Sequence, residues 1–272
     1  MINRFRTIEY SLPALEVEGL RFITVKTPNL LGRGDITVYV PADHIDDSAT
    51  SLPVVTLLHG VYGSHWAWAF KGGAHRTAAR LIAQGAIQPM VIAMPSDGLY
   101  GDGSAYLPHS GRDFESWILH DVHDALAAAG LPIDSQSPRF IAGLSMGGYG
   151  ALRLAALHPQ HYSAASGMSS VTHINQFSSL IEEPVSQFGL ARQEQSLSEL
   201  IIRHSASLPP IQFDCGTEDP FIESNRELHR ALDAAGVQHT YLEYPGGHEW
   251  AYWDEHLQDT LLFFESVLGS WP

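Results

Sequence analysis

The sequence predicts one α/β domain over residues 1–272, with a mostly parallel central sheet flanked by helices. Short apolar runs alternate along the chain with amphipathic stretches, which is the pattern of strands joined by covering helices. With 44% hydrophobic and 17% charged residues, the chain can bury a substantial core. Its length suits one large domain, and neither a linker nor an internal repeat divides it.

The first half of the chain carries the expected edge of the sheet and its first central strands. The two earliest strands are expected to form an antiparallel edge pair, whereas the run VVTLLH is apolar throughout, as a strand covered on both faces should be. A helix over residues 74–84 ends at Gly85. The expected strands are 21–27, 36–40, 54–59 and 89–94.

The second half continues the alternation of helices and strands. Residues 169–209 lack a clean strand period and are expected to form an irregular, partly helical insertion near the mouth of the site. The expected strands are 139–143, 162–167, 211–215 and 239–244. The expected helices are 114–129, 147–157, 223–235 and 254–268.

The stretch Gly143-Leu144-Ser145-Met146-Gly147 matches the motif G-x-S-x-G. A buried strand, RFIA, runs directly into it, and a helix, GGYGALRLAAL, runs directly out of it. In this strand–turn–helix context a serine is held on a strained backbone with its hydroxyl exposed. The context therefore indicates Ser145 as the nucleophile of an α/β-hydrolase fold.

A serine hydroxyl needs a base, and in this fold an acid and then a histidine follow the serine along the chain. Asp219 stands after the strand IQFDC, and His248 stands in the loop PGGHEW after the strand HTYLEY. The stretch between them leaves room for one helix and one strand. Asp219 is the predicted acid, and its neighbour Glu218 is the alternative, because the sequence does not fix which side chain turns inward.

The oxyanion that forms when a serine attacks a carbonyl needs two backbone N–H donors. One is expected from Met146, the residue after the nucleophile. The other is expected from the loop after VVTLL, which reads HGVYG and whose glycines let the backbone approach a substrate closely. Val61 is the predicted second donor, and Gly60 is the alternative.

Together these motifs resemble the esterase D, or putative esterase, group of α/β-hydrolases, which includes S-formylglutathione hydrolases, feruloyl and acetyl esterases and mycolyltransferases. The matching stretches are LLHGVYG, AMPSDG, RFIAGLSMGGYGALRLAALHP, DCGTEDPF and YPGGHEWAYW. The resemblance implies triad roles for Ser145, Asp219 and His248 and oxyanion roles for Val61 and Met146. S-formylglutathione hydrolases carry a cysteine shortly after the oxyanion loop, and VYGSHWAW has none, which disfavours a glutathione thioester substrate.

Aromatic and histidine side chains follow the strand ends at which α/β sheets bind their ligands. We expect them to contact the substrate, and ordinary loop packing is the alternative for each. For Trp250, which follows His248 by two residues, holding the histidine loop in place is a further alternative. The predicted substrate-binding residues are Trp66, Trp68, Tyr100, Tyr106, His109 and Trp250.

Composition and charge disfavour several partners. Thirty acidic residues against 15 Lys and Arg give a net charge of −15, and no basic stripe offsets it, so nucleic acid is not an expected partner. No apolar run reaches the roughly 18 residues that span a bilayer. The charged N-terminus lacks a signal-peptide pattern, and the one cysteine, Cys215, forms no intrachain disulfide. Both features favour the cytoplasm, and the oligomeric state stays open, a homo-oligomer included.

The sequence thus predicts a serine carboxylic-ester hydrolase that acts on small or medium acyl esters through an acyl-enzyme. Its partner is a small-molecule ester, and the chemistry requires neither a metal nor an organic cofactor. An acyltransferase that passes the acyl group to an alcohol or sugar is the first alternative. A non-catalytic binding protein with the hydrolase fold is the second, and the complete triad argues against it.

Overall fold

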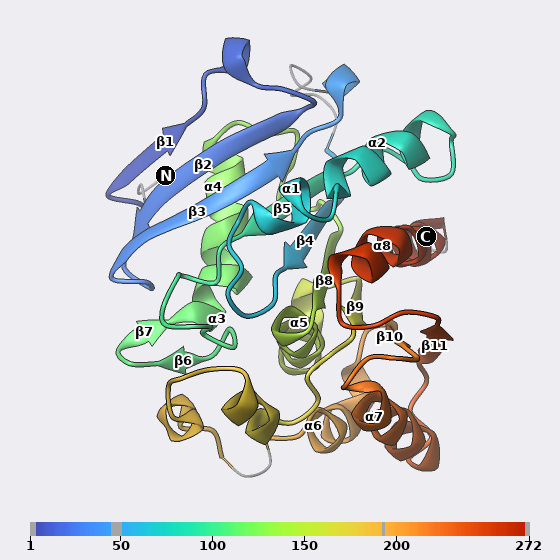
Figure 1. Ribbon diagram of the computed structural model, residues 1–272. Helices are drawn as coiled ribbons and strands as arrows, with labels where there is room; N and C mark the ends of the chain where they lie inside the picture. Colours follow the sequence, from blue (N-terminus) through green and yellow to red (C-terminus); the bar gives the residue numbers. More distant parts are fainter. Residues whose placement is uncertain (1–3, 45–50, 192–193, 270–272) are drawn as a thin grey trace.

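A computed structural model describes residues 4–44, 51–191 and 194–269, and its main feature is one large sheet (Figure 1). The strands are β1 Thr7–Tyr10, β2 Leu20–Thr27, β3 Gly32–Tyr39, β4 Val54–Leu58, β5 Val91–Pro95, β6 Pro108–His109, β7 Arg112–Asp113, β8 Arg139–Leu144, β9 Ala164–Met168, β10 Ile211–Gly216 and β11 Thr240–Tyr244. Among the described residues the sheet has nine strands in the order β1-β2-β3-β5-β4-β8-β9-β10-β11. All neighbours from β5 to β11 pair in parallel.

Helices cover both faces of this sheet. They are α1 Ala67–Phe70, α2 Ala74–Ala83, α3 Phe114–Ser116, α4 Val122–Ala128, α5 Met146–Leu157, α6 Leu197–Arg203, α7 Ile222–Ala234 and α8 Trp250–Gly269. One hydrophobic core lies between the sheet and α3 to α7, and a second lies between the sheet and α1, α2 and α8 (Figure 1). The predicted mostly parallel sheet with flanking helices is therefore confirmed. Within the described ranges, no helix combines the length and apolarity needed to cross a membrane.

The central strand β4 shows why an apolar run becomes a strand with two covered faces. All five of its residues are buried. Because successive side chains of a strand point to opposite faces, Val54 and Leu58 enter one core, whereas Val55 and Leu57 enter the other. A polar residue at any of these four positions would have to be buried without water.

The expected edge pair is corrected in one respect. β2 and β3 pair antiparallel as predicted, but β1 lies outside them and forms the true edge of the sheet. Three of the four residues of β1 are exposed, so the sequence has no hydrophobic pattern that predicts this strand. The sequence also gave no signal for the short hairpin of β6 and β7, whose two strands have two residues each.

As far as the structure describes it, the segment after β9 winds over the end of the sheet and adds no strand to it. It contains 3₁₀ turns over Ile174–Ser179 and Val185–Phe188 before α6 begins. Because parallel strands all end at one edge of a sheet, the loops that follow β4, β8, β10 and β11 converge there. This convergence brings together Gly60, Ser145, Asp219 and His248.

Candidate active site

Ser145 lies between β8 and α5 in a strained backbone conformation. Its φ of 55° and ψ of −115° are rarely adopted by a residue with a side chain. Two backbone hydrogen bonds hold it there: Ser145 N–H donates to Met168 O at 2.9 Å, and Val171 N–H donates to Ser145 O at 3.1 Å. The end of β9 and the loop after it therefore hold the backbone on both sides of Ser145.

Glycine at two positions of the motif allows this turn to form. A Cβ atom on Gly143 would lie 2.3 Å from Gly147 O, and a Cβ atom on Gly147 would lie 2.2 Å from Leu58 O. Both distances fall far inside van der Waals contact with backbone atoms that cannot move aside. Helix α5 can therefore pack this closely on β8 and β4 only because these two side chains are missing.

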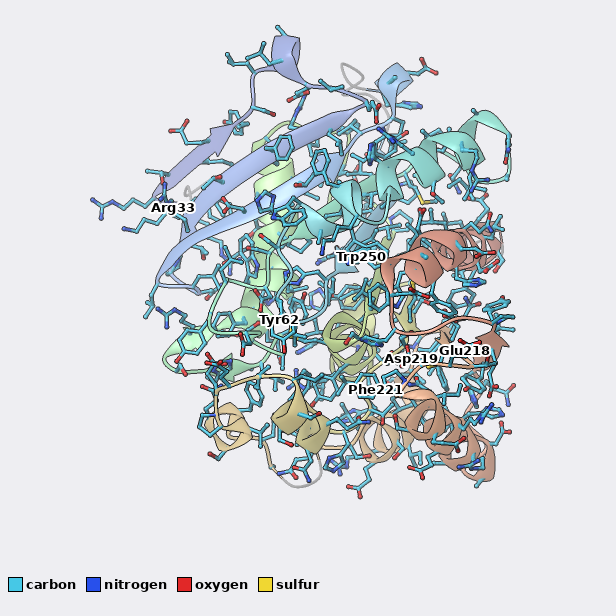
Figure 2. All side chains as sticks on the ribbon, in the orientation of Figure 1. Arg33, Tyr62, Glu218, Asp219, Phe221 and Trp250 are labelled. Carbon is cyan, nitrogen blue, oxygen red and sulfur yellow. The ribbon has the colours of Figure 1, made fainter. Side chains whose placement is uncertain are left out.

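His248 connects Ser145 to a buried carboxylate. His248 Nε2 lies 3.0 Å from Ser145 Oγ, and His248 Nδ1 lies 2.8 Å from Asp219 Oδ2. Asp219 is buried, with 2% of its surface exposed, whereas Glu218 is exposed (Figure 2). Phe221 N–H donates to Asp219 Oδ1 at 2.8 Å, which turns this carboxylate inward at the start of α7. Of the two acids that the sequence offered, only Asp219 is placed beside the histidine.

Two aromatic rings hold the His248 imidazole between them. Phe221 and Trp253 both meet it edge to face, with ring centroids 5.1 and 4.9 Å away. Trp253 is itself anchored, because its Nε1–H donates to Ser169 Oγ at 3.3 Å. This role of Phe221 was not predicted from the sequence. The feature that could have indicated it is its position two residues after Asp219.

The loop after β4 presents its backbone to the same point. Gly60 and Val61 line the cavity beside Ser145. His59 Nε2 accepts a hydrogen bond from Asp97 N–H at 3.1 Å, so the neutral ring carries its proton on Nδ1 and donates it to Gly60 O at 2.7 Å. The Gly60 C=O and the Val61 N–H belong to the same trans peptide group and point in opposite directions. Because His59 holds the Gly60 C=O, the Val61 N–H points away from His59.

Two N–H groups near Ser145 remain available to a ligand. Met146 is the first residue of α5, so its N–H has no acceptor within the helix. Within the described parts of the chain, neither the Val61 N–H nor the Met146 N–H donates to another protein group. Tyr106 Oη–H donates to His59 O at 2.9 Å and so also steadies the loop that carries Val61.

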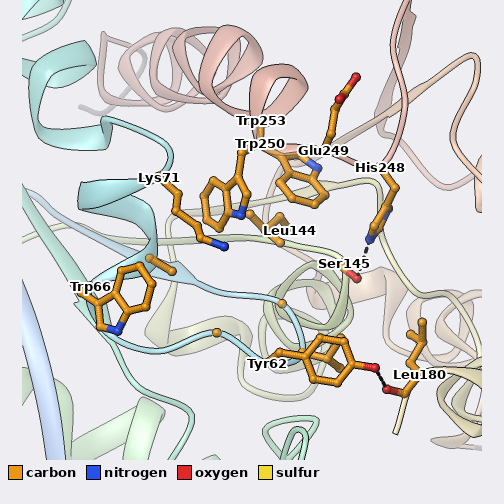
Figure 3. Close-up of a pocket in the computed structure, with 14 residues that line it drawn as sticks. Tyr62, Trp66, Lys71, Leu144, Ser145, Leu180, His248, Glu249, Trp250 and Trp253 are labelled. Atoms are coloured by element: carbon orange, nitrogen blue, oxygen red, sulfur yellow. Dashed lines mark hydrogen bonds between the residues drawn. The ribbon is translucent and has the colours of Figure 1, made fainter.

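A cavity of about 450 Å³ opens above Ser145 and His248 (Figure 3). Trp66 and Trp250, both predicted to bind substrate, line it. Lys71 also lines it, and its Nζ lies 6.0 and 5.9 Å from the ring centroids of these two tryptophans. The remaining walls come from Val61, Tyr62, Leu144, Leu180, Glu249 and Trp253. Most of this surface is apolar or aromatic, which suits an uncharged organic group.

Four other residues that were predicted to bind substrate do not line this cavity. Trp68 is buried behind Trp250, and its Nε1–H donates to Leu58 O at 3.0 Å. Tyr106 is fully buried beneath His59. His109 is buried against Phe114 and Phe188, and Tyr100 packs on His109. Trp68, Tyr106 and His109 turn into the core, where burying a large ring is favourable, and Tyr100 is half-buried against it.

Comparison with known proteins agrees with this fold. Residues 29–264 match the family described as Putative esterase. An acetyl esterase of Caldicellulosiruptor saccharolyticus is 23% identical over 242 residues, which cover 82% of this chain and 86% of the relative. The chain spans about half the length of other curated relatives that it matches.

Solved structures of low sequence identity share the whole fold. A ferulic acid esterase superposes with a TM-score of 0.78 at 24% identity, covering 96% of this chain and 98% of the other. An S-formylglutathione hydrolase from Staphylococcus aureus superposes with a TM-score of 0.75 at 20% identity, covering 94% and 98%. The fold is therefore that of the α/β-hydrolases. The chain belongs to the Putative esterase family, and it is an esterase.

Proposed function

We propose that the chain hydrolyses carboxylic esters with Ser145 as nucleophile, His248 as base and Asp219 as the acid that orients His248. The observation that carries this proposal is the continuous path of contacts from Asp219 through His248 to Ser145, at 2.8 and 3.0 Å, on the floor of one cavity. Both distances are within hydrogen-bonding range before any substrate arrives.

The direction of proton flow follows from the buried carboxylate. An ionised carboxylate only accepts hydrogen bonds, so Asp219 requires the neutral His248 ring to carry its proton on Nδ1. The lone pair of Nε2 then faces Ser145 Oγ and can accept the hydroxyl proton. Once His248 is protonated, its positive charge lies beside Asp219, which stabilises it.

The reaction proceeds in two halves. Ser145 Oγ bonds to the ester carbonyl carbon while His248 takes its proton, and the oxyanion accepts hydrogen bonds from the Val61 and Met146 N–H groups. Collapse of this intermediate breaks the bond to the alcohol, which leaves with the proton from His248. Water then gives a proton to His248 and attacks the acyl-enzyme. The bond between the acyl group and Ser145 Oγ breaks, the acid leaves, and His248 returns the proton to Ser145 Oγ.

The cavity supports small or medium acyl esters as substrates. Its volume of about 450 Å³ and its aromatic walls suit an acyl or alcohol group of modest size. Named relatives act on an acetyl ester in one case and on ferulic acid esters in another, and both fit within this range.

The test is hydrolysis of p-nitrophenyl esters of increasing acyl length by the wild type and by Ser145→Ala. We expect turnover that is greatest for short chains and a loss on the order of 10⁵-fold or more in the variant. Turnover that persists in Ser145→Ala would overturn the proposal. If the wild type releases p-nitrophenol but transfers the acyl group to an added alcohol instead of water, the chain is an acyltransferase.

A further inference from the structure

A second group of histidine and aspartate side chains lies at the opposite end of α7 and β11 from His248. His229 and Asp233 stand one helical turn apart near the end of α7, and His239 stands directly before β11. One side-chain ligand atom from each of the three lies within 4.8 Å of the other two. The site described above uses none of these residues.

The hydrogen bonds of this cluster show where its nitrogen lone pairs point. His239 Nδ1–H donates to Val237 O at 2.8 Å, so the lone pair of His239 Nε2 is directed outward. His229 Nδ1 lies 2.8 Å from that Nε2 and donates to it. The Asp233 carboxylate lies 3.9 Å from His239 Nε2 and 3.5 Å from His229 Nε2. His229 thus faces His239 with Nδ1 and Asp233 with Nε2, and one ligand atom from each of the three residues lies within 4.8 Å of the others.

Both rings are held in place by neighbouring aromatic residues. His239, whose side chain is 2% exposed, stacks on Phe213 with centroids 5.5 Å apart. His229 stacks on Tyr241 with centroids 4.8 Å apart. The Asp233 side chain is 63% exposed and is free to turn toward a ligand. An ion arriving from solvent would therefore meet two ordered ligands and one adjustable ligand.

We propose that His229, Asp233 and His239 bind a divalent transition-metal ion of the zinc class, with water as the fourth ligand. Two imidazoles and a carboxylate suit Zn²⁺ and its neighbours, whereas Ca²⁺ and Mg²⁺ prefer oxygen ligands alone. A tetrahedral ion with metal–nitrogen bonds of about 2.0 Å needs its two nitrogens about 3.3 Å apart, so the 2.8 Å contact must open by about 0.5 Å.

Binding requires only small rearrangements of the cluster. The ring proton of His229 moves from Nδ1 to Nε2, which frees the Nδ1 lone pair and keeps the ring neutral. The hydrogen bond from His239 Nδ1–H to Val237 O already fixes that ring in the tautomer that a metal requires. The bound ion joins the last turn of α7 to the start of β11, so it stabilises the folded state.

The test is a calorimetric titration with ZnCl₂ of the full chain, first treated with EDTA and then freed of it. We expect one ion per chain with micromolar affinity, and at least a tenfold loss of affinity in His229→Ala and in Asp233→Asn. Both side chains are partly exposed, 35% and 63%, so their removal should leave the fold intact, which far-UV circular dichroism verifies. His204→Ala removes another partly exposed histidine, at the end of α6, and is the matched control.

Thermal unfolding provides a second readout. Saturating Zn²⁺ should raise Tm by a few degrees in the wild type and in His204→Ala, and by less in His229→Ala. Absence of saturable binding by the wild type would overturn the proposal. Equal affinities in His229→Ala and His204→Ala would also overturn it, because the ion would then be bound elsewhere, for example at His248.

Discussion

The two ends of the α7–β11 pair both bring histidine and aspartate side chains together, and aromatic rings hold the histidines at each end. At the near end, which lies by the loops that carry Ser145, Asp219 is buried and His248 contacts Ser145. At the far end, Asp233 is 63% exposed and His239 meets His229. Because the histidine–aspartate pairing is common to both ends, the pairing alone does not produce a nucleophile.

Two features distinguish the near end from the far end: the acid Asp219 is buried, and Ser145 has a strained backbone. Asp219 has both oxygens engaged, one by His248 and one by the Phe221 N–H, so it accepts from His248 in one geometry only. Asp233 makes long contacts to its histidines and can move toward an added ligand. These contacts support the proton transfer proposed for the near end and the ion binding proposed for the far end.

Among the variants that keep Ser145, Asp219→Asn gives the largest expected effect. An asparagine can donate its amide N–H to His248 Nδ1, which forces the ring proton onto Nε2 and leaves no lone pair facing Ser145. We expect kcat on a short-chain p-nitrophenyl ester to fall about 10³- to 10⁴-fold. Glu218→Gln, one residue away and exposed, is the matched control and should stay within about twofold of the wild type. A comparable loss in Glu218→Gln would mean that the acid is misassigned.

Val61→Pro tests the backbone donor at the near end. Proline has no N–H, so the oxyanion loses one of its two expected hydrogen bonds, and kcat should fall about 10²- to 10³-fold. Val61→Ala keeps the N–H and should retain most of the activity. Equal losses in the two variants would point to the shape of the loop and not to its donor.

Glu115→Gln tests how α5, the helix that begins directly after Ser145, is anchored. Burial alone would raise the pKa of Glu115. The carboxylate contacts His158, just after α5, and Arg153, within α5, and these two partners outweigh burial and lower the pKa to about 2. The folded-state pKa thus lies below the ordinary carboxyl value, so the stabilisation is present above about pH 4.5 and disappears as the pH falls toward 2. At pH 7 the variant should lose about 3 kcal/mol of unfolding free energy.

Denaturant unfolding at several pH values measures this difference. The gap between wild type and Glu115→Gln should shrink as the pH falls from 4.5. A gap that stays constant over that range would show that Glu115 acts through packing and not through its charge.

Asp233→Asn, in the absence of metal, gives the smallest expected effect. Its contacts to His229 and His239 are exposed and long, so the free energy of unfolding should change by less than about 0.5 kcal/mol. Denaturant unfolding in EDTA measures it. A loss above about 1 kcal/mol would show that the far end is a structural ion pair even without an ion.

The near end was largely predictable from sequence because its chemistry is local. The steric demands of the turn at Ser145 require glycines two residues before and after it, and strand ends of a parallel sheet share one edge, so Asp219 and His248 had to approach it. The choice between Asp219 and Glu218 was not predictable, because it depends on the bond from the Phe221 N–H.

The far end and the cavity walls could not be predicted in this way. His229 and His239 are brought together only when α7 packs beside β11, and no spacing along the chain encodes that contact. Trp68 and Tyr106 lie in the predicted segments that follow β4 and β5. Whether such a ring points into the cavity or into the core depends on the space left by helices that are distant in sequence.

The most direct test of the account is labelling with a fluorophosphonate probe, followed by intact-mass measurement and peptide mapping. Activation by His248 should make Ser145 react alone among the serines, so the wild type should gain one adduct on the peptide containing Ser145, and Ser145→Ala should gain none. An adduct on another residue, or undiminished labelling of Ser145→Ala, would contradict the assignment of Ser145 as the nucleophile.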